Sequence, residues 1–362
     1  MQPTPEFIFA TCQIGAEPAL KAEIQRSRPD FRFAFSRPGF LTFKLPEGHG
    51  LAADFDLRST FARAYGFSLG PIAGPAFDAM AAEVWRLYGS RPAGAVHVWQ
   101  RDLDIAGRHG YVPALTCGAI EARAAILKAC PDEKLAAGLR GPFDEAKQGA
   151  FVLDCILVEP NKWWLGHHRA TGPCSRFAGG MFLIEPRQPP ISRAWYKVHE
   201  ALAWSRLPIP PGSRIADLGS APGGTSQALL ELGHWVLGID PAEMSGRILQ
   251  HPRFTHLRLR TTQVRRRAFR NVHWLLSDMS VAPDYTLDAA ESIVLRRDVR
   301  IHGMLLTLKL MEWRLCEQLG DYVRRVRSWG FDRVWTRQLA HNRREICLAA
   351  LKGRANSPSN AD

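Results

Sequence analysis

The sequence of 362 residues lacks several features that identify whole classes of protein. No apolar run approaches the roughly 18–20 residues that cross a bilayer. The first five residues, Met1 to Pro5, lack the basic-then-apolar pattern of a secretory signal. The seven cysteines are scattered and form no Cys-x-x-Cys pair, which argues against a disulfide framework and against a zinc site. We therefore expect a cytoplasmic protein that does not act at a membrane and has no metal site.

What the sequence has in excess is positive charge. Its 47 lysines and arginines outnumber 35 acidic residues, which gives a net charge of +12. Such an excess attracts polyanions, and nucleic acid is the commonest of them. An arginine-rich composition inherited from a GC-rich genome produces the same excess. The charge alone therefore leaves both explanations open.

The first half of the chain mixes strand-like and helix-like segments. Apolar runs at 7–10 and 40–43 predict strands, and apolar residues on one face predict a helix over 17–26. Further along, the same patterns predict helices over 77–88 and 119–129 and strands over 96–99 and 151–158. We predict one small α+β module over 1–69 and a second over 70–170.

A change of composition separates these modules from the rest. Residues 171–190 are rich in glycine, proline and arginine, and the proline-rich run Glu185–Pro190 cannot continue a helix. We predict a linker there. Ser192 then has the side chain of an N-cap, which predicts a helix from this point through Ser205.

Regular alternation of strand-like and helix-like segments begins after Gly212. The apolar strand-like runs are 214–218, 235–239, 256–259, 272–276, 304–308, 331–335 and 346–351. Continuous apolar strands separated by helices are typical of a parallel sheet that is covered on both faces. We predict an α/β domain with a seven-stranded, mostly parallel sheet over 191–353, and a disordered polar tail over 354–362.

The sharpest motif is a glycine-rich turn after the first of these strands. Asp217 ends the strand, and the turn Gly219-Ser-Ala-Pro-Gly-Gly224 then opens a helix. Glycines allow the backbone to approach a ligand closely, and such sheets bind ligands at the carboxyl ends of their strands. We expect Asp217 to face the amino group of a methionine moiety and Asp240, after the next strand, to accept hydrogen bonds from a ribose diol. The spacing differs from Gly-x-Gly-x-x-Gly, which disfavours the alternative of an NAD-type turn.

The motif Asp-Leu-Gly-Ser-Ala-Pro-Gly-Gly at 217–224 resembles the cofactor loop of the FtsJ-type ribose 2′-O-methyltransferases, which use S-adenosylmethionine (SAM). That family works with a Lys-Asp-Lys-Glu tetrad, whose matches here are Lys197, Asp278, Lys309 and Glu345. The resemblance implies a Rossmann-like methyltransferase domain, SAM as the cofactor and these four residues as catalytic. The cofactor contacts that we expect are Asp217, Gly219, Ser220, Ala221, Pro222, Gly223, Gly224, Asp240 and Asp278.

Two members of the tetrad also stand out without the resemblance. Asp278 and Lys309 each close an apolar strand, so both are expected at the ligand-binding edge of the sheet. A free lysine has a pKa near ~10.4, so Lys309 needs a drop of about 2–3 units to act as a base near neutrality. Burial and Lys197 favour that drop, whereas Asp278 and Glu345 oppose it. The sequence leaves open whether Lys309 removes a proton or orients the hydroxyl group and stabilises the alkoxide.

A closer resemblance is to the M-type methyltransferases of large-subunit ribosomal RNA, which modify the 2′-oxygen of a cytidine. These proteins carry a ferredoxin-like piece and a THUMP RNA-binding domain before the FtsJ-type domain, which implies those identities for 1–69 and 70–170. It implies 23S rRNA or its precursor as the partner. Ser192-Arg193 followed by Lys197 and Glu200 is similar to the entry of that family's catalytic domain. Two positions depart from the family pattern: Thr225 replaces an aromatic residue, and Thr261-Thr262 replace an acidic residue near the adenine.

Clustered arginines and a histidine–tryptophan segment have both structural and RNA-binding interpretations. The arginines are Arg258, Arg260, Arg265, Arg266, Arg267 and Arg270, and a second group is Arg324, Arg325 and Arg327. For the first group we favour phosphate contacts over a solvated face. In the segment 161–169, Trp163 and Trp164 either stack on RNA bases or pack in the core. We assign no metal to His167 and His168.

We expect the protein to be a monomer. Two other functions stay open at this stage. One is a methyltransferase that acts on transfer RNA, a messenger RNA cap or a hemolysin-like target. The other is a non-catalytic RNA-binding module that keeps SAM as a structural ligand. The tetrad favours ribose chemistry but does not identify the target RNA, and its intact state argues against the non-catalytic module.

Overall fold

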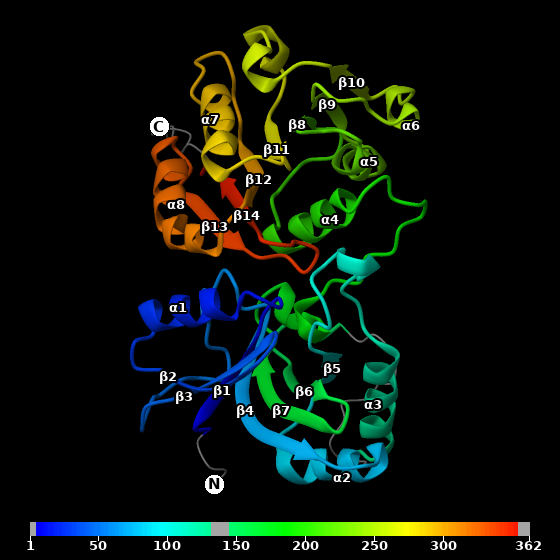
Figure 1. Cartoon of the computed structure of the whole chain (residues 1–362), viewed down its shortest axis with the longest axis vertical. Coiled ribbons are helices and arrows are strands. Elements are labelled where there is room, and N and C mark those ends of the chain that lie inside the picture. The colour runs from blue at the N-terminus through cyan, green and yellow to red at the C-terminus, as the bar shows by residue number, and fades with distance from the viewer. Residues whose placement is uncertain (1–4, 132–144, 354–362) are drawn as a thin grey trace, which may run out of the picture. The chain divides into compact units, whose positions relative to one another are not determined.

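The computed structural model describes residues 5–131 and 145–353, and the chain forms two compact units (Figure 1). We call Met1–Leu183 the N-terminal unit and Ile184–Asp362 the C-terminal unit. Each contains one seven-stranded sheet. The division between the units falls inside the predicted linker, 171–190. The predicted disordered tail, 354–362, lies outside the described residues.

The N-terminal unit is a mixed sheet of order β2-β3-β1-β4-β7-β6-β5 with three α-helices among its described residues. The strands are β1 Phe7–Thr11, β2 Arg32–Arg37, β3 Phe40–Lys44, β4 Ala64–Ala73, β5 Ala95–Gln100, β6 Phe151–Glu159 and β7 Lys162–Arg169. The helices are α1 Glu17–Ser27, α2 Phe77–Tyr88 and α3 Cys117–Lys128. The predicted boundary between 69 and 70 falls inside β4, so strands of both predicted modules share one sheet. Their ferredoxin-like and THUMP-like identities stay predictions.

The segment with the two tryptophans is strand β7, whose side chains alternate between the faces of the sheet. Trp163 is fully buried in the core formed with α2 and α3, as the packing interpretation predicted. Trp164 points to the other face, where its ring stacks on Phe35 at 5.2 Å between ring centroids. Its indole N–H donates to Ser68 Oγ.

The C-terminal unit has the predicted seven-stranded, mostly parallel sheet, of order β10-β9-β8-β11-β12-β14-β13. The strands are β8 Arg214–Leu218, β9 Trp235–Ile239, β10 Phe254–Leu257, β11 Trp274–Ser277, β12 Gly303–Lys309, β13 Arg333–Arg337 and β14 Glu345–Leu351. Only β14 runs in the opposite direction to the other six strands, so its pairings with β12 and β13 are antiparallel. The order reverses between β8 and β11, where parallel sheets of this kind bind ligands.

Helices cover both faces of this sheet (Figure 1). They are α4 Ala194–Ser205, α5 Gly224–Glu231, α6 Gly246–Leu249, α7 Pro283–Val294 and α8 Leu319–Ser328. Helices α4 and α5 bury Trp195, Val198 and Leu229 against one face. The predicted N-cap is wrong: α4 begins at Ala194 with Arg193 as N-cap, while Ser192 Oγ accepts a hydrogen bond from the Ala194 amide. No described helix combines the length and the apolar character that crossing a membrane requires.

Candidate active site

The glycine-rich turn lies where the strand order of the sheet reverses. It leaves the carboxyl end of β8, and the Gly219 amide donates to the Ile239 carbonyl oxygen at the end of β9. Gly219 has a φ of +77°, and a Cβ there would lie 2.8 Å from Met279 Cγ and 2.9 Å from Met279 Cα. Gly223 has a φ of +124°. Left-handed φ values and close packing both require glycine, so the loop presents bare backbone to the crevice.

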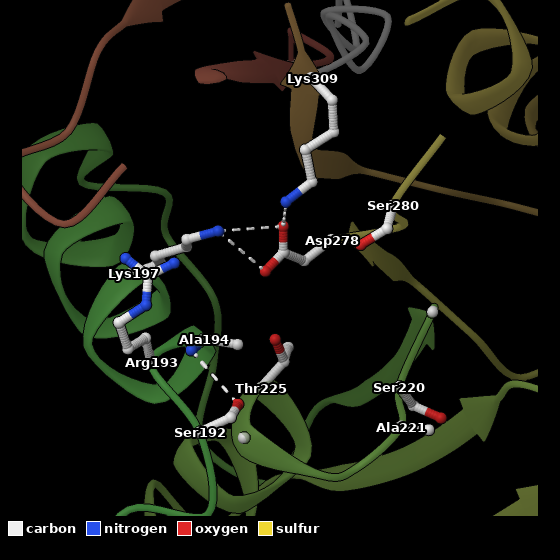
Figure 2. A pocket seen from close by; sticks show the side chains of 12 residues that line it. Ser192, Arg193, Ala194, Lys197, Ser220, Ala221, Thr225, Asp278, Ser280 and Lys309 are labelled. Carbon is white, nitrogen blue, oxygen red and sulfur yellow. Dashed lines mark hydrogen bonds and ion pairs between the residues drawn. The ribbon is translucent and has the colours of Figure 1, made fainter. Parts of the chain in front are cut away.

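A cavity of about 210 Å³ opens between this loop, the start of α4 and the ends of β11 and β12 (Figure 2). Its lining residues are Ser192, Arg193, Ala194, Lys197, Gly219, Ser220, Ala221, Gly224, Thr225, Asp278, Ser280 and Lys309. Five of the predicted cofactor contacts are among them, and so are three members of the tetrad. The glycine cradle thus lies on one side of the cavity, and the charged groups lie on the other.

Asp217 and Asp240, the two acidic residues predicted to contact the cofactor outside the tetrad, lie in different surroundings. Asp240 holds the turn, because its carboxylate oxygens accept from the Ala221 and Ala242 amides. Asp217 is fully buried beneath the loop, where Ser226 Oγ donates to its Oδ2 at 2.7 Å. Burial raises the pKa of Asp217 to about 7, although the Ser226 hydrogen bond opposes this shift. Neither residue lines the cavity, and their contacts with a methionine amine and a ribose diol stay predictions.

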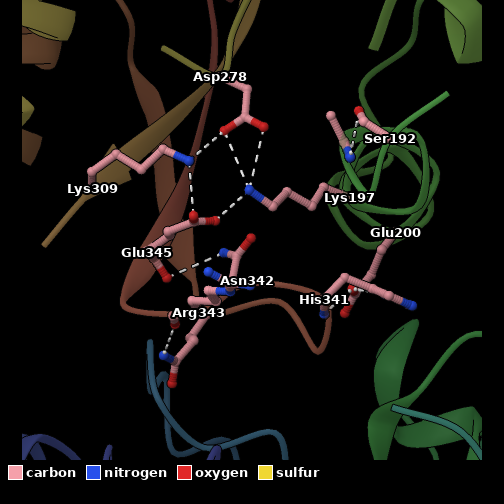
Figure 3. A network of polar contacts seen from close by, with 11 residues as sticks. Ser192, Lys197, Glu200, Asp278, Lys309, His341, Asn342, Arg343 and Glu345 are labelled. Carbon is pink, nitrogen blue, oxygen red and sulfur yellow. Dashed lines mark hydrogen bonds and ion pairs between the residues drawn. The ribbon is translucent and has the colours of Figure 1, made fainter. Parts of the chain in front are cut away.

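The four residues of the predicted tetrad come together at one point (Figure 3). Lys309 Nζ lies 3.0 Å from Asp278 Oδ1 and 2.8 Å from Glu345 Oε1. Lys197 Nζ lies 3.3 Å from Asp278 Oδ2 and 2.5 Å from Glu345 Oε2. Each carboxylate therefore contacts both ammonium groups. Lys309 and Glu345 are also direct partners across β12 and β14, which fixes their spacing.

The opposite charges in this closed ring shift the pKa values of Lys309 and Glu345. Burial of the Lys309 ammonium opposes its charge, but Asp278 and Glu345 outweigh burial and raise the pKa of Lys309 above its usual value. Burial likewise opposes the charge of Glu345, but Lys197 and Lys309 lower the pKa of Glu345. The raised pKa favours the charged form of Lys309 in the resting site, and its role in the reaction stays a prediction.

Glu200, one turn after Lys197, entered the sequence analysis only as part of a resemblance that assigned it no role, but the structure shows that it is a buried carboxylate. The Oε atoms of Glu200 accept hydrogen bonds from the Ala340 and His341 amides and from His341 Nδ1. The His341 ring stacks on Tyr196 of the same helix. Helix α4 thereby clamps the turn that leads into Glu345. The available signal was its spacing of three residues from Lys197, which places the two charged side chains on the same side of a helix.

Three buried side chains of the N-terminal unit have the spacing of a metal site. Ligand atoms of His97, Asp154 and His168 lie within 4.8 Å of one another. However, His168 Nδ1 lies 2.6 Å from Asp154 Oδ2, and its Nε2 lies 2.7 Å from the Ser175 carbonyl oxygen. Both acceptors call for a proton on the facing ring nitrogen, and an imidazolium has no lone pair for a metal. We interpret the cluster as a buried ion pair.

The comparison with protein families decides what the C-terminal unit is. Residues 190–325 match the family described as FtsJ-like methyltransferase. The C-terminal unit carries an FtsJ-like methyltransferase domain. The match includes the glycine-rich turn, Lys197, Asp278 and Lys309 and ends before Glu345. It also agrees with the strand order of the sheet, so the predicted Rossmann-like fold is confirmed.

Several relatives of this chain share one name. Ribosomal RNA large subunit methyltransferase M of Halorhodospira halophila is 32% identical over 173 residues, which are 46% of this chain and 48% of that protein. The protein of that name from Mannheimia succiniciproducens is 26% identical over 147 residues, 39% and 40% of the two chains. The matched segments span less than half the length of these relatives. Among solved structures, Methanococcus jannaschii fibrillarin, a pre-rRNA processing protein, aligns over 40% of this chain and 69% of its own, with 13% identity and a TM-score of 0.33.

The close packing of Gly219 gives a first testable expectation for the FtsJ-like domain. A Gly219→Ala substitution forces a non-glycine residue into the left-handed region, at a cost of about 1–3 kcal/mol, and presses its methyl group on the Met279 backbone. We expect a lower free energy of unfolding in urea and weaker SAM binding by titration calorimetry. Gly246→Ala is the matched control, because a Cβ at Gly246 meets nothing within 4 Å. Equal SAM affinity of the two variants would contradict the role assigned to the turn.

Proposed function

We propose that this protein transfers a methyl group from SAM to a ribose 2′-hydroxyl group of RNA, with a cytidine of 23S rRNA as the target. The single observation that carries the proposal is the ring of Lys197, Asp278, Lys309 and Glu345 at the mouth of the glycine-lined cavity. The likeness to proteins named ribosomal RNA large subunit methyltransferase M supports ribosomal RNA as the substrate. The positive net charge supports a polyanionic partner.

The residues around the cavity suit both reactants. Gly219, Ser220 and Ala221 would hold SAM, with Asp240 behind the turn. When bound, SAM supplies a methyl group on a sulfonium cation. Asp278 lines the cavity and also contacts both lysines. It is therefore the residue that joins the cofactor side to the tetrad.

For the proton, we infer that Lys309 acts as an orienting cation rather than as a resting base. Its raised pKa keeps the ammonium charged near neutral pH. The Nζ–H groups can then donate to the attacking 2′-oxygen and stabilise the negative charge that develops on it. The hydroxyl proton passes to the Asp278 carboxylate, whose Oδ1 lies 3.0 Å from Lys309 Nζ. The C–O bond forms as the C–S bond breaks.

The pH dependence of the rate distinguishes the two roles of Lys309. A base that must first lose a proton with a pKa above its usual value gives a rate that rises about tenfold per pH unit through the neutral range. An orienting cation gives a flat profile there and a loss of activity only as the pH rises through that pKa. We expect the flat profile in single-turnover methyl transfer between neutral and moderately alkaline pH. A steep, unbroken rise would assign the proton to Lys309.

Labelled cofactor tests the proposed reaction. The protein is incubated with tritiated SAM and ribosomal RNA from a strain that lacks the gene, and the product is hydrolysed in alkali. A 2′-O-methyl group blocks cleavage at its nucleotide, so we expect label in alkali-resistant dinucleotides from large-subunit RNA. Label that alkali releases in mononucleotides would place the methyl group on a base and overturn the proposal. SAM binding without label in any RNA would favour a non-catalytic module.

A further inference from the structure

The amino ends of the strands in the C-terminal sheet carry a row of basic and aromatic side chains. Arg214 is the first residue of β8, Trp235 is the first residue of β9, and Arg253 directly precedes β10. His273 directly precedes β11, and His302 directly precedes β12. We call these five residues the amino-edge row. It lies at the edge of the sheet opposite the glycine-rich turn, and none of its members was among the predicted site residues.

Backbone pairing makes the row continuous, although its members come from five separate segments of the chain. Arg214 and Trp235 are direct partners across β8 and β9, and the Arg253 carbonyl oxygen accepts from the amide that follows Trp235, at 2.9 Å. The His273 amide donates to the Arg214 carbonyl oxygen at 3.1 Å, and the His302 amide donates to the His273 carbonyl oxygen at 2.8 Å. The two histidine rings stack at 5.4 Å between ring centroids. The row therefore follows the strand order β10-β9-β8-β11-β12 (Figure 1).

Trp235 is an exposed aromatic side chain within the row. Of its surface, 43% is exposed, and the guanidinium carbons of Arg214 and Arg253 lie 5.6 Å and 5.8 Å from the centroid of its ring. A guanidinium group within about 6 Å of an aromatic ring is attracted to it, so both arginines are held beside the indole. An exposed indole can stack on an unpaired base, and the arginines beside it can contact the phosphates of the same strand.

The basic side chains of the row have no acidic partners. Among the residues that the structure describes, no carboxylate forms an ion pair with any of them. Arg253 Nη1 instead donates to the Gly233 carbonyl oxygen. By contrast, the exposed Arg324 on α8 of the same unit pairs with Asp321. The positive charge of the row is therefore not compensated within the described part of the chain.

The surroundings of His302 are also cationic. Burial lowers the pKa of His302, and the neighbouring His273, Lys352 and Arg300 lower it further. The Lys352 amide donates to the His302 carbonyl oxygen, so this lysine extends the line of basic residues. The carboxylate of Asp332 lies before β13, at the far end of the sheet, and accepts a backbone amide. Like charges that gather on one edge repel one another and attract a polyanion.

We propose that the amino-edge row is a second RNA-binding surface of this protein, separate from the catalytic cavity. This inference rests on the proposed function, which makes RNA the partner. Trp235 stacks on an unpaired base, while Arg214 and Arg253 contact phosphates in a region of the RNA away from the target ribose. The exposed indole favours RNA over an acidic protein, because it offers a stacking surface in addition to the charges. Such contacts hold and orient the RNA without reading its sequence.

The position of the row predicts an effect on binding and none on the chemical step. Strand β8 crosses the sheet in the five residues Arg214–Leu218. With a rise of about 3.3 Å per residue, the row lies roughly 15 Å from the glycine-rich turn. Side chains at this distance do not touch the reacting atoms. Their loss should therefore raise the KM for RNA and leave kcat unchanged.

The test measures how tightly Arg214→Ala, Arg253→Ala and Trp235→Ala bind a labelled fragment of 23S rRNA, by fluorescence anisotropy at several salt concentrations. Each arginine variant should lower the slope of log affinity against log salt by about one, because one phosphate contact is lost. Trp235→Ala should weaken binding about tenfold through the loss of one stacked base, with little change in the slope. Arg214→Lys keeps the charge, so its slope should stay near that of the original protein. SAM binding should be unchanged in all four variants.

Arg324→Ala is the matched control, because it removes the same charge from an exposed arginine that is paired with Asp321. An equal loss of slope in this control would reflect the net charge of the protein and overturn the proposed surface. Unchanged RNA affinity in all three alanine variants of the row, shown to be folded by thermal melting, would overturn it as well. Binding of polyglutamate that these variants lose, with RNA affinity intact, would assign the row to an acidic protein instead. A protein that binds RNA through the row but methylates none would refute the proposed function and leave this surface standing.

Discussion

Replacing Lys309 with alanine should reduce methyl transfer to RNA by about 10²–10⁴-fold, the range that positioned proton-handling groups contribute. The substitution removes the cation that faces the hydroxyl group and leaves Asp278 and Glu345 with Lys197 as their shared partner. Because Lys309 is not among the expected cofactor contacts, SAM affinity should change little. Single-turnover transfer of tritiated methyl groups measures the rate, and titration calorimetry measures the affinity for SAM.

A matched control and a second variant make this expectation decisive. Lys147→Ala removes an exposed lysine of the N-terminal unit and should leave the rate within experimental error. Asp278→Asn keeps the size of the side chain but removes its charge, and should lower the rate as strongly as Lys309→Ala. If Lys309→Ala retained a tenth or more of the activity with its SAM binding intact, the chemistry would have to be assigned to another residue.

Replacing Glu200 with alanine should lower the free energy of unfolding by about 3–5 kcal/mol, as expected when one partner of a buried charged pair is removed. Two backbone amides and His341 Nδ1 would lose their acceptor in a water-excluded site. The turn before Glu345 would then lose its anchor on α4, so methyl transfer should fall as well. Urea unfolding measures the first effect, with exposed Glu317→Ala as the control.

The difference in the free energy of unfolding between the original protein and Glu200→Ala should change with pH in one direction. Burial opposes the charge of Glu200, but hydrogen bonds from His341 and the two backbone amides outweigh burial and lower the pKa of Glu200. A carboxyl group whose pKa is lowered by folding stabilises the protein above its unfolded pKa of about 4.3, and this contribution is lost as the pH falls through the folded value. The gap between the original protein and Glu200→Ala should therefore narrow in acid. A constant gap would show that packing, not the charge, is what Glu200 contributes.

The architecture of the C-terminal unit followed from the sequence because most of its strands lie in continuous apolar runs. The same property placed Asp278 and Lys309, since a charged residue that ends such a strand can only project at the edge of the sheet. Strand β10 lies two residues earlier than predicted, at 254–257, because its residues are half-buried or exposed instead of forming a continuous buried run.

The sequence patterns of β2 and β4 were too weak to predict these strands fully. Strand β2 is exposed over most of its length, and β4 contains Gly70 and Pro71 next to an irregular register, so neither has the pattern of a buried strand. Glu200 acquires its role from partners more than 100 residues away in the chain, which no local pattern reveals. The pairing of the tetrad residues needed the resemblance to a family, because Lys197 and Glu345 alone are ordinary charged residues.

The most direct test of the central claim is the nucleoside composition of 23S rRNA from a strain that lacks the gene. The strain is complemented with the original protein or with Asp278→Asn, and the RNA is digested to nucleosides and analysed by mass spectrometry. We predict 2′-O-methylcytidine that the original protein restores and the variant does not. Equal amounts in both strains, or a methyl group that appears on the base, would contradict ribose methylation by the tetrad.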